Sequence, residues 1–297
     1  MDLLRFFKKK FFLVMLLVVL AVFLRALPKF GVFPGLDSGI VLNGGNRLLD
    51  SQVVYKDFFS FWTPGSFLIS AFTIFLFGNS VLAMSCISFF VQVVGVFCVM
   101  YLINNLTLDK KTKYIYWGII AYFVNLTVIF LDYNHKLWSQ LFFLVSLVFA
   151  TLYVKNKNRL ILYALGFSIG LTAFITQNEG FVIFCSTLFL LFWLKSKIKD
   201  YLVLLLGVIT VWFPFIVYLI INNAFGDFVN QVIIFPFTGY QTITHNAIAI
   251  YILNIKNNIF TTSVVSKLIV PAGLVIFGFF LIVLKLFYIK KKKVDCR

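Results

Sequence analysis

Three carboxylates stand close together in a segment that follows a long apolar run. Asp37, Asp50 and Asp57 lie within residues 36–65, LDSGIVLNGGNRLLDSQVVYKDFFSFWTPG, although the whole chain has only ten acidic residues. A carboxylate at the edge of a membrane is costly unless it is solvated, paired or used in a reaction. A carboxylate base of this kind takes a proton from an attacking hydroxyl group. Asp37 and Asp57 are therefore the candidate catalytic residues, whereas we expect Asp50 to be solvated.

Two short polar segments farther along the chain add further reactive groups. Residues 131–137 read LDYNHKL, and residues 176–180 read TQNEG and contain the chain's single glutamate. Asp132 and Glu179 offer oxygen ligands for a divalent metal, but the carboxylates are too scattered to predict a metal site. More ordinary roles are an interfacial anchor for His135 and an ion pair between Asp57 and Lys56 or Arg47. The candidate substrate-binding residues are Arg47, Tyr55, Lys56, Asp132, Asn134, His135, Lys136, Gln177, Asn178 and Glu179.

The composition places these residues in a membrane protein. Of the 297 residues, 62% are hydrophobic and 12% are charged, and long apolar runs alternate with short basic clusters. This pattern is typical of polytopic helical membrane proteins, because the polar groups of the backbone must be satisfied internally in lipid. We therefore expect an all-α polytopic membrane protein that forms a single transmembrane domain over residues 1–297.

Eight spans are predicted, with a helical outer loop after the first span. The segment 66–77, SFLISAFTIFLF, is apolar but falls short of the roughly 20 residues that cross a bilayer. We interpret it as an interfacial or re-entrant helix; a short crossing, which would shift every later span, is the alternative. The long outer segments are then 28–80 and 222–262. The predicted spans are 11–27, 81–104, 114–131, 137–154, 160–176, 180–194, 201–221 and 266–287.

The distribution of basic residues favours this arrangement. If 66–77 does not cross, 19 of the 26 Lys and Arg residues fall on the side that holds both termini. Cytoplasmic loops carry an excess of Lys and Arg, and a crossing at 66–77 would remove most of this asymmetry. We therefore predict that both termini are cytoplasmic and that the candidate residues lie on the outer face. Because the basic clusters separate apolar runs, the net charge of +16 does not indicate a nucleic-acid partner.

Several segments resemble one family of membrane enzymes. They are GLDSG, VVYKDFFSFWTPG and FLISAFTIFLFGNS in the first outer segment, and later LDYNHKLWSQLFFLVSL, GLTAFITQNEGF and FGDFVNQVIIFPFTGY. The first outer segment is similar to that of the GT-C membrane glycosyltransferases, nearest to the branch of protein O-mannosyltransferases, aminoarabinose transferases and Rgt-like proteins. The likeness covers most of the chain, and the first segment is its most specific part.

This resemblance implies an inverting transfer of a sugar from a polyprenyl-phosphate donor to a protein, lipid or glycan acceptor. Asp37 would be the general base, and Asp57 would orient the acceptor or pair with a cation. Arg47, Lys56, Lys136 or His135 would neutralise the leaving phosphate. The resemblance also implies residence in a prokaryotic plasma membrane, with membrane lipids as partners.

Two other functions stay open. One is a lipid or polysaccharide transporter or flippase, which should place polar residues inside its spans. The predicted spans hold few such groups, for example Gln92 and Asn125. The other is a shortened, non-catalytic GT-C relative. No soluble-enzyme motif such as GxxxxGK[ST], GxGxxG, GxSxG or HExxH occurs in the chain.

Overall fold

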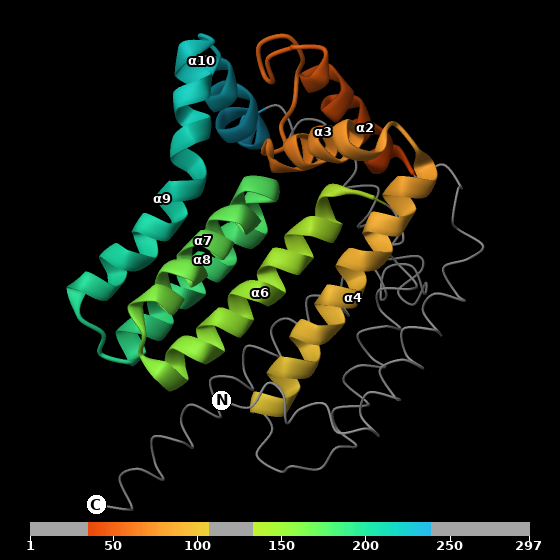
Figure 1. Ribbon diagram of the computed structural model, residues 1–297. Coiled ribbons are helices and arrows are strands. Elements are labelled where there is room, and N and C mark those ends of the chain that lie inside the picture. The colour runs from red at the N-terminus through yellow and green to blue at the C-terminus, as the bar shows by residue number, and fades with distance from the viewer. Residues whose placement is uncertain (1–34, 107–132, 239–297) are drawn as a thin grey trace, which may run out of the picture. The chain divides into compact units, whose positions relative to one another are not determined.

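A computed structural model describes residues 35–106 and 133–238, and every regular element in these ranges is a helix (Figure 1). The chain divides into two compact units, residues 1–103 with 111–234 and residues 104–110 with 235–297. The candidate site residues described below all belong to the first unit. The single domain over residues 1–297 stays a prediction.

The helices follow the predicted segments closely. Two short helices precede the first long helix, and two short helices follow the last long one. The elements are α2 (Leu36–Leu49), α3 (Gly65–Phe77), α4 (Val81–Leu106), α6 (His135–Asn156), α7 (Arg159–Ile175), α8 (Gln177–Trp193), α9 (Ile198–Ile221), α10 (Phe225–Phe228) and the π-helix η3 (Val229–Ile234).

Three described helices are long and apolar enough to cross a membrane. They are Val81–Leu102, His135–Asn156 and Ile198–Ile221, while α7 and α8 are apolar helices of 17 residues each. The all-α membrane class is thus supported. The predicted spans 11–27, 114–131 and 266–287 lie outside the described residues, so the total of eight stays a prediction.

Helices α7 and α9 pack closely because glycines stand where their backbones meet. A Cβ atom on Gly166 of α7 would lie 2.1 Å from the backbone oxygen of Leu204 in α9, and one on Gly207 would lie 2.4 Å from that of Tyr163. Glycine at such crossings lets two apolar helices approach without a hydrophobic driving force between them. The α7–α9 crossing therefore tolerates no side chain at these two positions.

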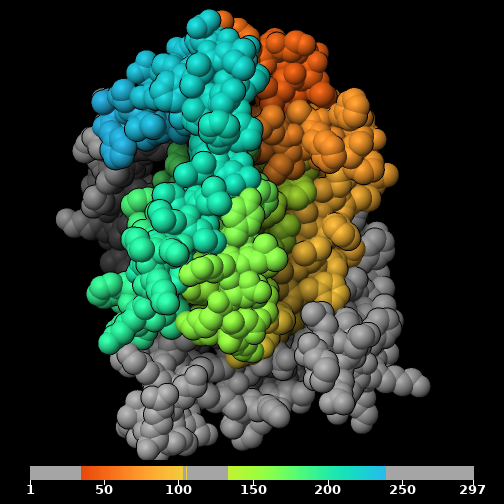
Figure 2. All heavy atoms as spheres, turned by 60° about the vertical axis from the view of Figure 1, so that its left-hand side comes forward, coloured from red at the N-terminus to blue at the C-terminus, as the bar shows by residue number. Residues whose placement is uncertain are grey.

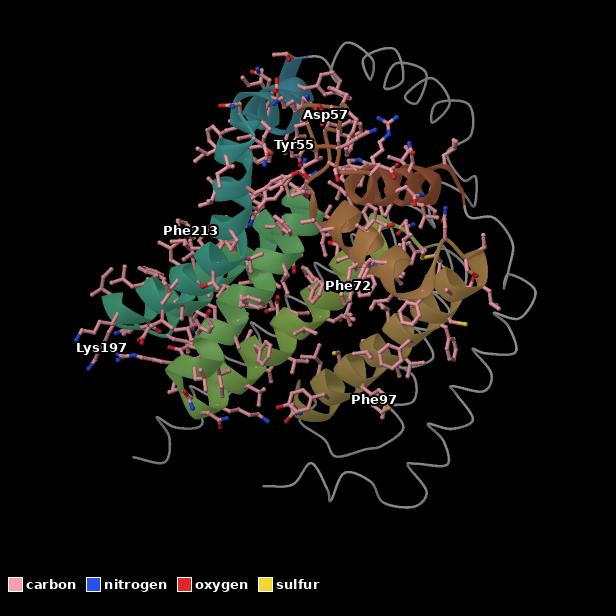
Figure 3. The ribbon with its side chains drawn as sticks, turned by 45° about the horizontal axis from the view of Figure 1, so that its top comes forward. Tyr55, Asp57, Phe72, Phe97, Lys197 and Phe213 are labelled. Carbon is pink, nitrogen blue, oxygen red and sulfur yellow. The ribbon has the colours of Figure 1, made fainter. Side chains whose placement is uncertain are left out.

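Large apolar side chains cover the outer surfaces of the long helices. The side chains of Phe97 in α4 and Phe213 in α9 are 43% and 63% exposed (Figure 3). Helix α9 forms much of the surface seen in Figure 2. Exposed phenylalanines on long apolar helices suit contact with lipid rather than with water.

Helices α2 and α3 lie across one end of this bundle (Figure 1). With 13 residues, α3 is about 20 Å long, too short for a bilayer core of about 30 Å. The start of α3 meets the end of α7, because a Cβ atom on Gly65 would lie 2.6 Å from the backbone oxygen of Phe174. The candidate residues lie in or next to α2 and at the starts of α6 and α8.

Candidate functional site

The predicted site residues form two groups at this end of the bundle. The His135 group consists of Asp37, Asn134, His135, Lys136, Gln177, Asn178 and Glu179, which stand at or next to the first turns of α2, α6 and α8. The loop group consists of Arg47, Tyr55, Lys56 and Asp57, which lie at the end of α2 or in the segment 50–64 (Figure 3). Asp132 lies outside the described residues.

His135 is the centre of the first group. It is buried at the start of α6, and its imidazole lies against the indole of Trp62, with ring centroids 4.3 Å apart and an interplanar angle of 34°. Its Nδ1 atom is buried and has no hydrogen-bond partner among the described residues. The exposed carboxylate of Asp37, in the first turn of α2, acts electrostatically on this imidazole. Residues 98 positions apart in the chain thus share one electrostatic environment.

Glu179 supplies a second carboxylate to this group. The hydroxyl group of Ser139 donates a hydrogen bond to it, and the charge of Lys136 attracts it. Burial raises the pKa of Glu179 above its ordinary value, and these two neighbours oppose that rise. Glu179 precedes the predicted span 180–194, so the structure places it where the apolar bundle begins.

The amides of the His135 group have structural contacts. Asn134 begins α6, because its side-chain oxygen accepts a hydrogen bond of 3.1 Å from the backbone N–H of Leu137. Such a cap satisfies one of the unpaired N–H groups of the first helical turn. Gln177 donates from Nε2 to the backbone oxygen of Phe61 at 3.4 Å, which ties the start of α8 to the loop before α3. Asn178 is exposed.

Tyr55 is a core residue of the loop group. It has a φ of 73° and is 2% exposed, and its hydroxyl group donates to the backbone oxygen of Trp62 at 2.9 Å. Its ring meets those of Phe215 and Phe228 edge-on, at centroid distances of 6.4 and 5.2 Å. Burial raises the pKa of the Tyr55 hydroxyl well above its usual value. These contacts give Tyr55 the role of fixing the loop.

The remaining members of the loop group also hold backbone or rings in place. Lys56 donates from Nζ to the backbone oxygen of Asn222, at the end of α9, at 2.9 Å. Asp57 closes a turn, since its Oδ2 accepts from the backbone N–H of Val53 at 2.6 Å. The guanidinium of Arg47 lies 5.3 Å from the centroid of the Phe58 ring. These contacts replace the predicted pairing of Asp57 with Lys56 or Arg47.

Gln231 is the residue that the sequence analysis missed. Its Nε2 donates to the backbone oxygen of Tyr55 at 2.6 Å, and its Oε1 accepts from the backbone N–H of Ser60 at 2.9 Å. A single side chain of η3 thereby binds both ends of the turn 55–60. No local pattern predicts this contact, because 171 residues separate Gln231 from Ser60.

The described residues offer little for a metal ion. No cluster of three or more His, Cys, Asp or Glu side chains that could hold a metal occurs among residues 35–106 and 133–238. The idea of a divalent metal between Asp132 and Glu179 stays untested, because Asp132 is not described.

The His135 group consists largely of side chains that can exchange protons or carry charge. It combines an exposed carboxylate, a buried imidazole held by an indole ring, and an ammonium group beside a second carboxylate.

A search of protein families, of curated proteins and of solved structures found no match to this chain. The assignment of the site therefore rests on these contacts.

Proposed function

We propose that the protein is a membrane glycosyltransferase that moves a sugar from a polyprenyl-phosphate donor to a hydroxyl acceptor on the non-cytoplasmic face. The observation that carries the proposal is the packing of α2, which has Asp37 in its first turn, against the start of α6. Val41 and Leu42 of α2 share a buried core cluster with Tyr133, two residues before His135. This packing supports a reaction centre shared by the first outer segment and the start of α6. The long apolar helices support a donor that partitions into the bilayer.

The proposed reaction is a direct displacement at the anomeric carbon. The carboxylate of Asp37 takes the proton of the acceptor hydroxyl, and the acceptor oxygen forms a bond to that carbon. The bond between the carbon and the phosphate oxygen breaks, and polyprenyl phosphate leaves with the electron pair. A positioned general base of this kind contributes about 10²–10⁴-fold to the rate. The exposure of Asp37 is consistent with access for an acceptor.

Lys136 is the cation we assign to the leaving phosphate. It follows His135 directly in the first turn of α6, and its charge acts on Glu179. A fixed cation stabilises the negative charge that develops on the leaving group. Lys56 and Arg47 have partners within the loop group and are assigned to the structure of the loop rather than to the phosphate.

The test is transfer of radiolabelled sugar from a panel of polyprenyl-phosphate sugars by the purified chain. We expect Asp37→Asn to reduce transfer by about 10²–10⁴-fold. Asp50→Asn, which changes an exposed carboxylate at the other end of the same helix, should retain full activity. Transfer that survives Asp37→Asn would move the base to another residue, with Asp57 the next candidate. No transfer with any donor by folded wild-type protein would overturn the proposal.

Transport is a second candidate, favoured by one observation inside the bundle. The hydroxyl group of Ser146 in α6 donates to that of Ser168 in α7 at 2.9 Å, and both residues are buried. Intramembrane polar pairs can mark a substrate path, although they also join helices in bundles. If Ser146→Ala and Ser168→Ala abolish lipid translocation in vesicles while Asp37→Asn leaves it intact, the transporter is the better description.

A further inference from the structure

The turns that join α6 to α7 and α8 to α9 form one basic surface, which the proposed reaction does not use. We call it the basic turn face. Both turns lie at the end of the bundle opposite α2 and α3 (Figure 1). In the two turns and the helix residues that flank them, residues 155–160 and 194–200, Asp200 is the one acidic residue. The basic residues of the face, all exposed, are Lys155, Lys157, Arg159, Lys195, Lys197 and Lys199.

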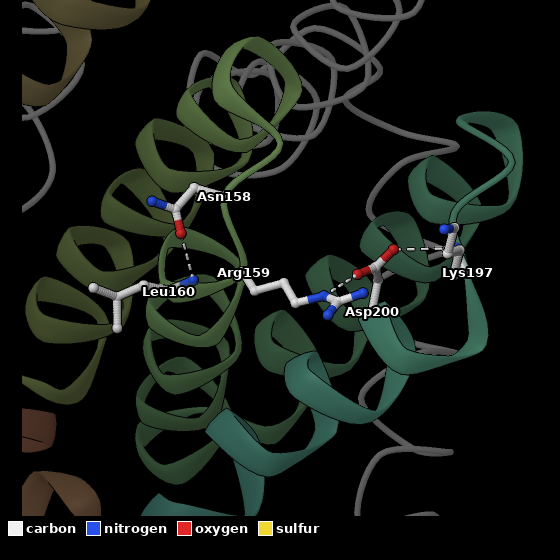
Figure 4. Close-up of polar contacts among 5 residues, drawn as sticks. All are labelled: Asn158, Arg159, Leu160, Lys197 and Asp200. Carbon is white, nitrogen blue, oxygen red and sulfur yellow. Dashed lines mark hydrogen bonds and ion pairs between the residues drawn. The ribbon is translucent and has the colours of Figure 1, made fainter.

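Contacts between the two turns fix the backbones that carry these cations relative to each other. Arg159 Nε lies 2.9 Å from Asp200 Oδ1, and Asp200 Oδ2 accepts from the backbone N–H of Lys197 at 3.1 Å (Figure 4). The side chain of Tyr153, at the end of α6, is hydrogen-bonded to Ser196 of the other turn. The single carboxylate is thus occupied in joining α7 to α9. The face as a whole carries six cations and one anion.

Each turn keeps a lysine at a position that favours glycine. Lys157 has a φ of 53° and directly follows α6, and Lys195 has a φ of 51° and follows α8 after Leu194. A side chain with a Cβ atom is disfavoured in this left-handed region, where glycine is the usual residue. A cation at a helix C-terminus is favoured by the partial negative charge there. Both turns therefore accept backbone strain and hold positive charge.

The lengths of the helices place the basic turn face at the level of the lipid headgroups. Helix α6 has 22 residues and α9 has 24, so they are about 33 and 36 Å long, close to the bilayer core of about 30 Å. The lysines at their ends therefore reach the level of the headgroups. Aromatic residues stand beside them, as in the interfacial belts of membrane proteins. These aromatic residues are Trp193 and Tyr201, both partly exposed.

We infer that the basic turn face binds the phosphate groups of anionic phospholipids in the adjacent leaflet. Flexible lysine side chains at the end of an apolar helix extend to the headgroups and are attracted by anionic lipids. A nucleic acid or an acidic protein fits less well, because the cations border apolar, lipid-facing helices. The inference does not depend on the proposed reaction at the other end of the bundle.

The test compares the lipids that remain bound to the full chain. Wild-type protein is extracted from vesicles made of equal parts phosphatidylcholine and phosphatidylglycerol, and the retained lipids are quantified by mass spectrometry. We expect several-fold enrichment of phosphatidylglycerol, weakened when the extraction is repeated in high salt. The variant K157G/K195G removes two charges at positions where glycine is favoured, and should reduce the enrichment by about fivefold or more. K157R/K195R should retain it.

The variants also separate charge from folding. K157G/K195G should melt no lower than wild type in phosphatidylcholine alone, because glycine suits both positions. If it melts lower, K155Q/K197Q, at positions without a positive φ, provides the same readout. Equal retention of the two lipids by wild type would overturn the inference. So would enrichment that survives both high salt and the loss of the lysines, or occupation of the face by an acidic protein in place of lipid.

Discussion

The indole ring of Trp62 lies against the imidazole of His135, with ring centroids 4.3 Å apart. Trp62 belongs to the segment that precedes α3, and His135 begins α6. The backbone oxygen of Trp62 also accepts a hydrogen bond from the hydroxyl group of Tyr55. Trp62 thus connects the two groups of candidate residues, and substitutions around it should affect both the fold and the site.

Replacement of Trp62 tests this connection. We expect Trp62→Leu to lower the free energy of unfolding by on the order of 2 kcal/mol, because ring contacts are lost in a partly buried place. Trp62→Phe keeps a ring against His135 and should cost less. Thermal melting in detergent measures both. Equal melting of the two variants would show that the ring contact with His135 contributes little.

Gln231 should control the order of the turn 55–60. Gln231→Leu removes two hydrogen bonds to backbone groups, each with a net contribution of about 1 kcal/mol. We expect faster amide hydrogen exchange over residues 53–61 and a lower melting temperature. The control is Asn230→Ala, which changes the neighbouring exposed amide. If both variants exchange at the wild-type rate, the turn is held by its aromatic contacts instead.

Two glycines of α2 provide a matched pair for packing against α3. A Cβ atom on Gly45 would lie 2.8 Å from the backbone nitrogen of Ala71 and from the side chain of Ser70, whereas a Cβ atom on Gly39 would have nothing within 4 Å. We expect Gly45→Ala to lower stability by about 1–3 kcal/mol through overpacking. Gly39→Ala should be neutral or raise stability by about 0.5–1 kcal/mol. Similar melting temperatures would mean that α2 can move away from α3.

The pKa of Glu179 predicts a pH dependence of stability. Burial raises the pKa of this carboxyl group in the folded protein above its ordinary value. The folded state therefore holds this proton more tightly than the unfolded state. The stabilising contribution is complete below the ordinary carboxyl pKa and is lost as the pH rises through the folded-state pKa.

Glu179→Gln removes this titration and keeps an oxygen that can accept from Ser139. As the pH rises from the ordinary carboxyl pKa through the folded-state pKa, wild type loses this stabilisation and the variant does not. We therefore expect the melting temperature of the variant to rise relative to that of wild type over this pH range. Ser139→Ala removes the donor and should leave the pKa of Glu179 higher still. Parallel pH profiles for wild type and Glu179→Gln would contradict the assignment.

Much of the architecture could be predicted from the sequence. Apolar runs bounded by basic clusters predicted the helices at 81–104, 137–154, 160–176, 180–194 and 201–221, and α4, α6, α7, α8 and α9 lie there. The apolar segment 66–77 was predicted to be a helix too short to cross, and α3 (Gly65–Phe77) lies there. These predictions succeed because the length and polarity of a segment decide locally whether its backbone can be helical in lipid.

The contacts within the site depend on the tertiary structure. The sequence presented Tyr55, Lys56, Asp57 and Arg47 as one chemical set, yet their partners are Phe228, Asn222, Val53 and Phe58. The charge of Asp37 acts on His135, 98 positions away in the chain, although nothing in their local sequences relates them. Two pairings within the site, Gln231 with Tyr55 and Lys56 with Asn222, join segments more than 150 residues apart, and local composition does not encode them. The sequence by itself determined the long apolar helices of the described bundle and the end of it that carries the cations. The tertiary structure decided which polar groups lie together.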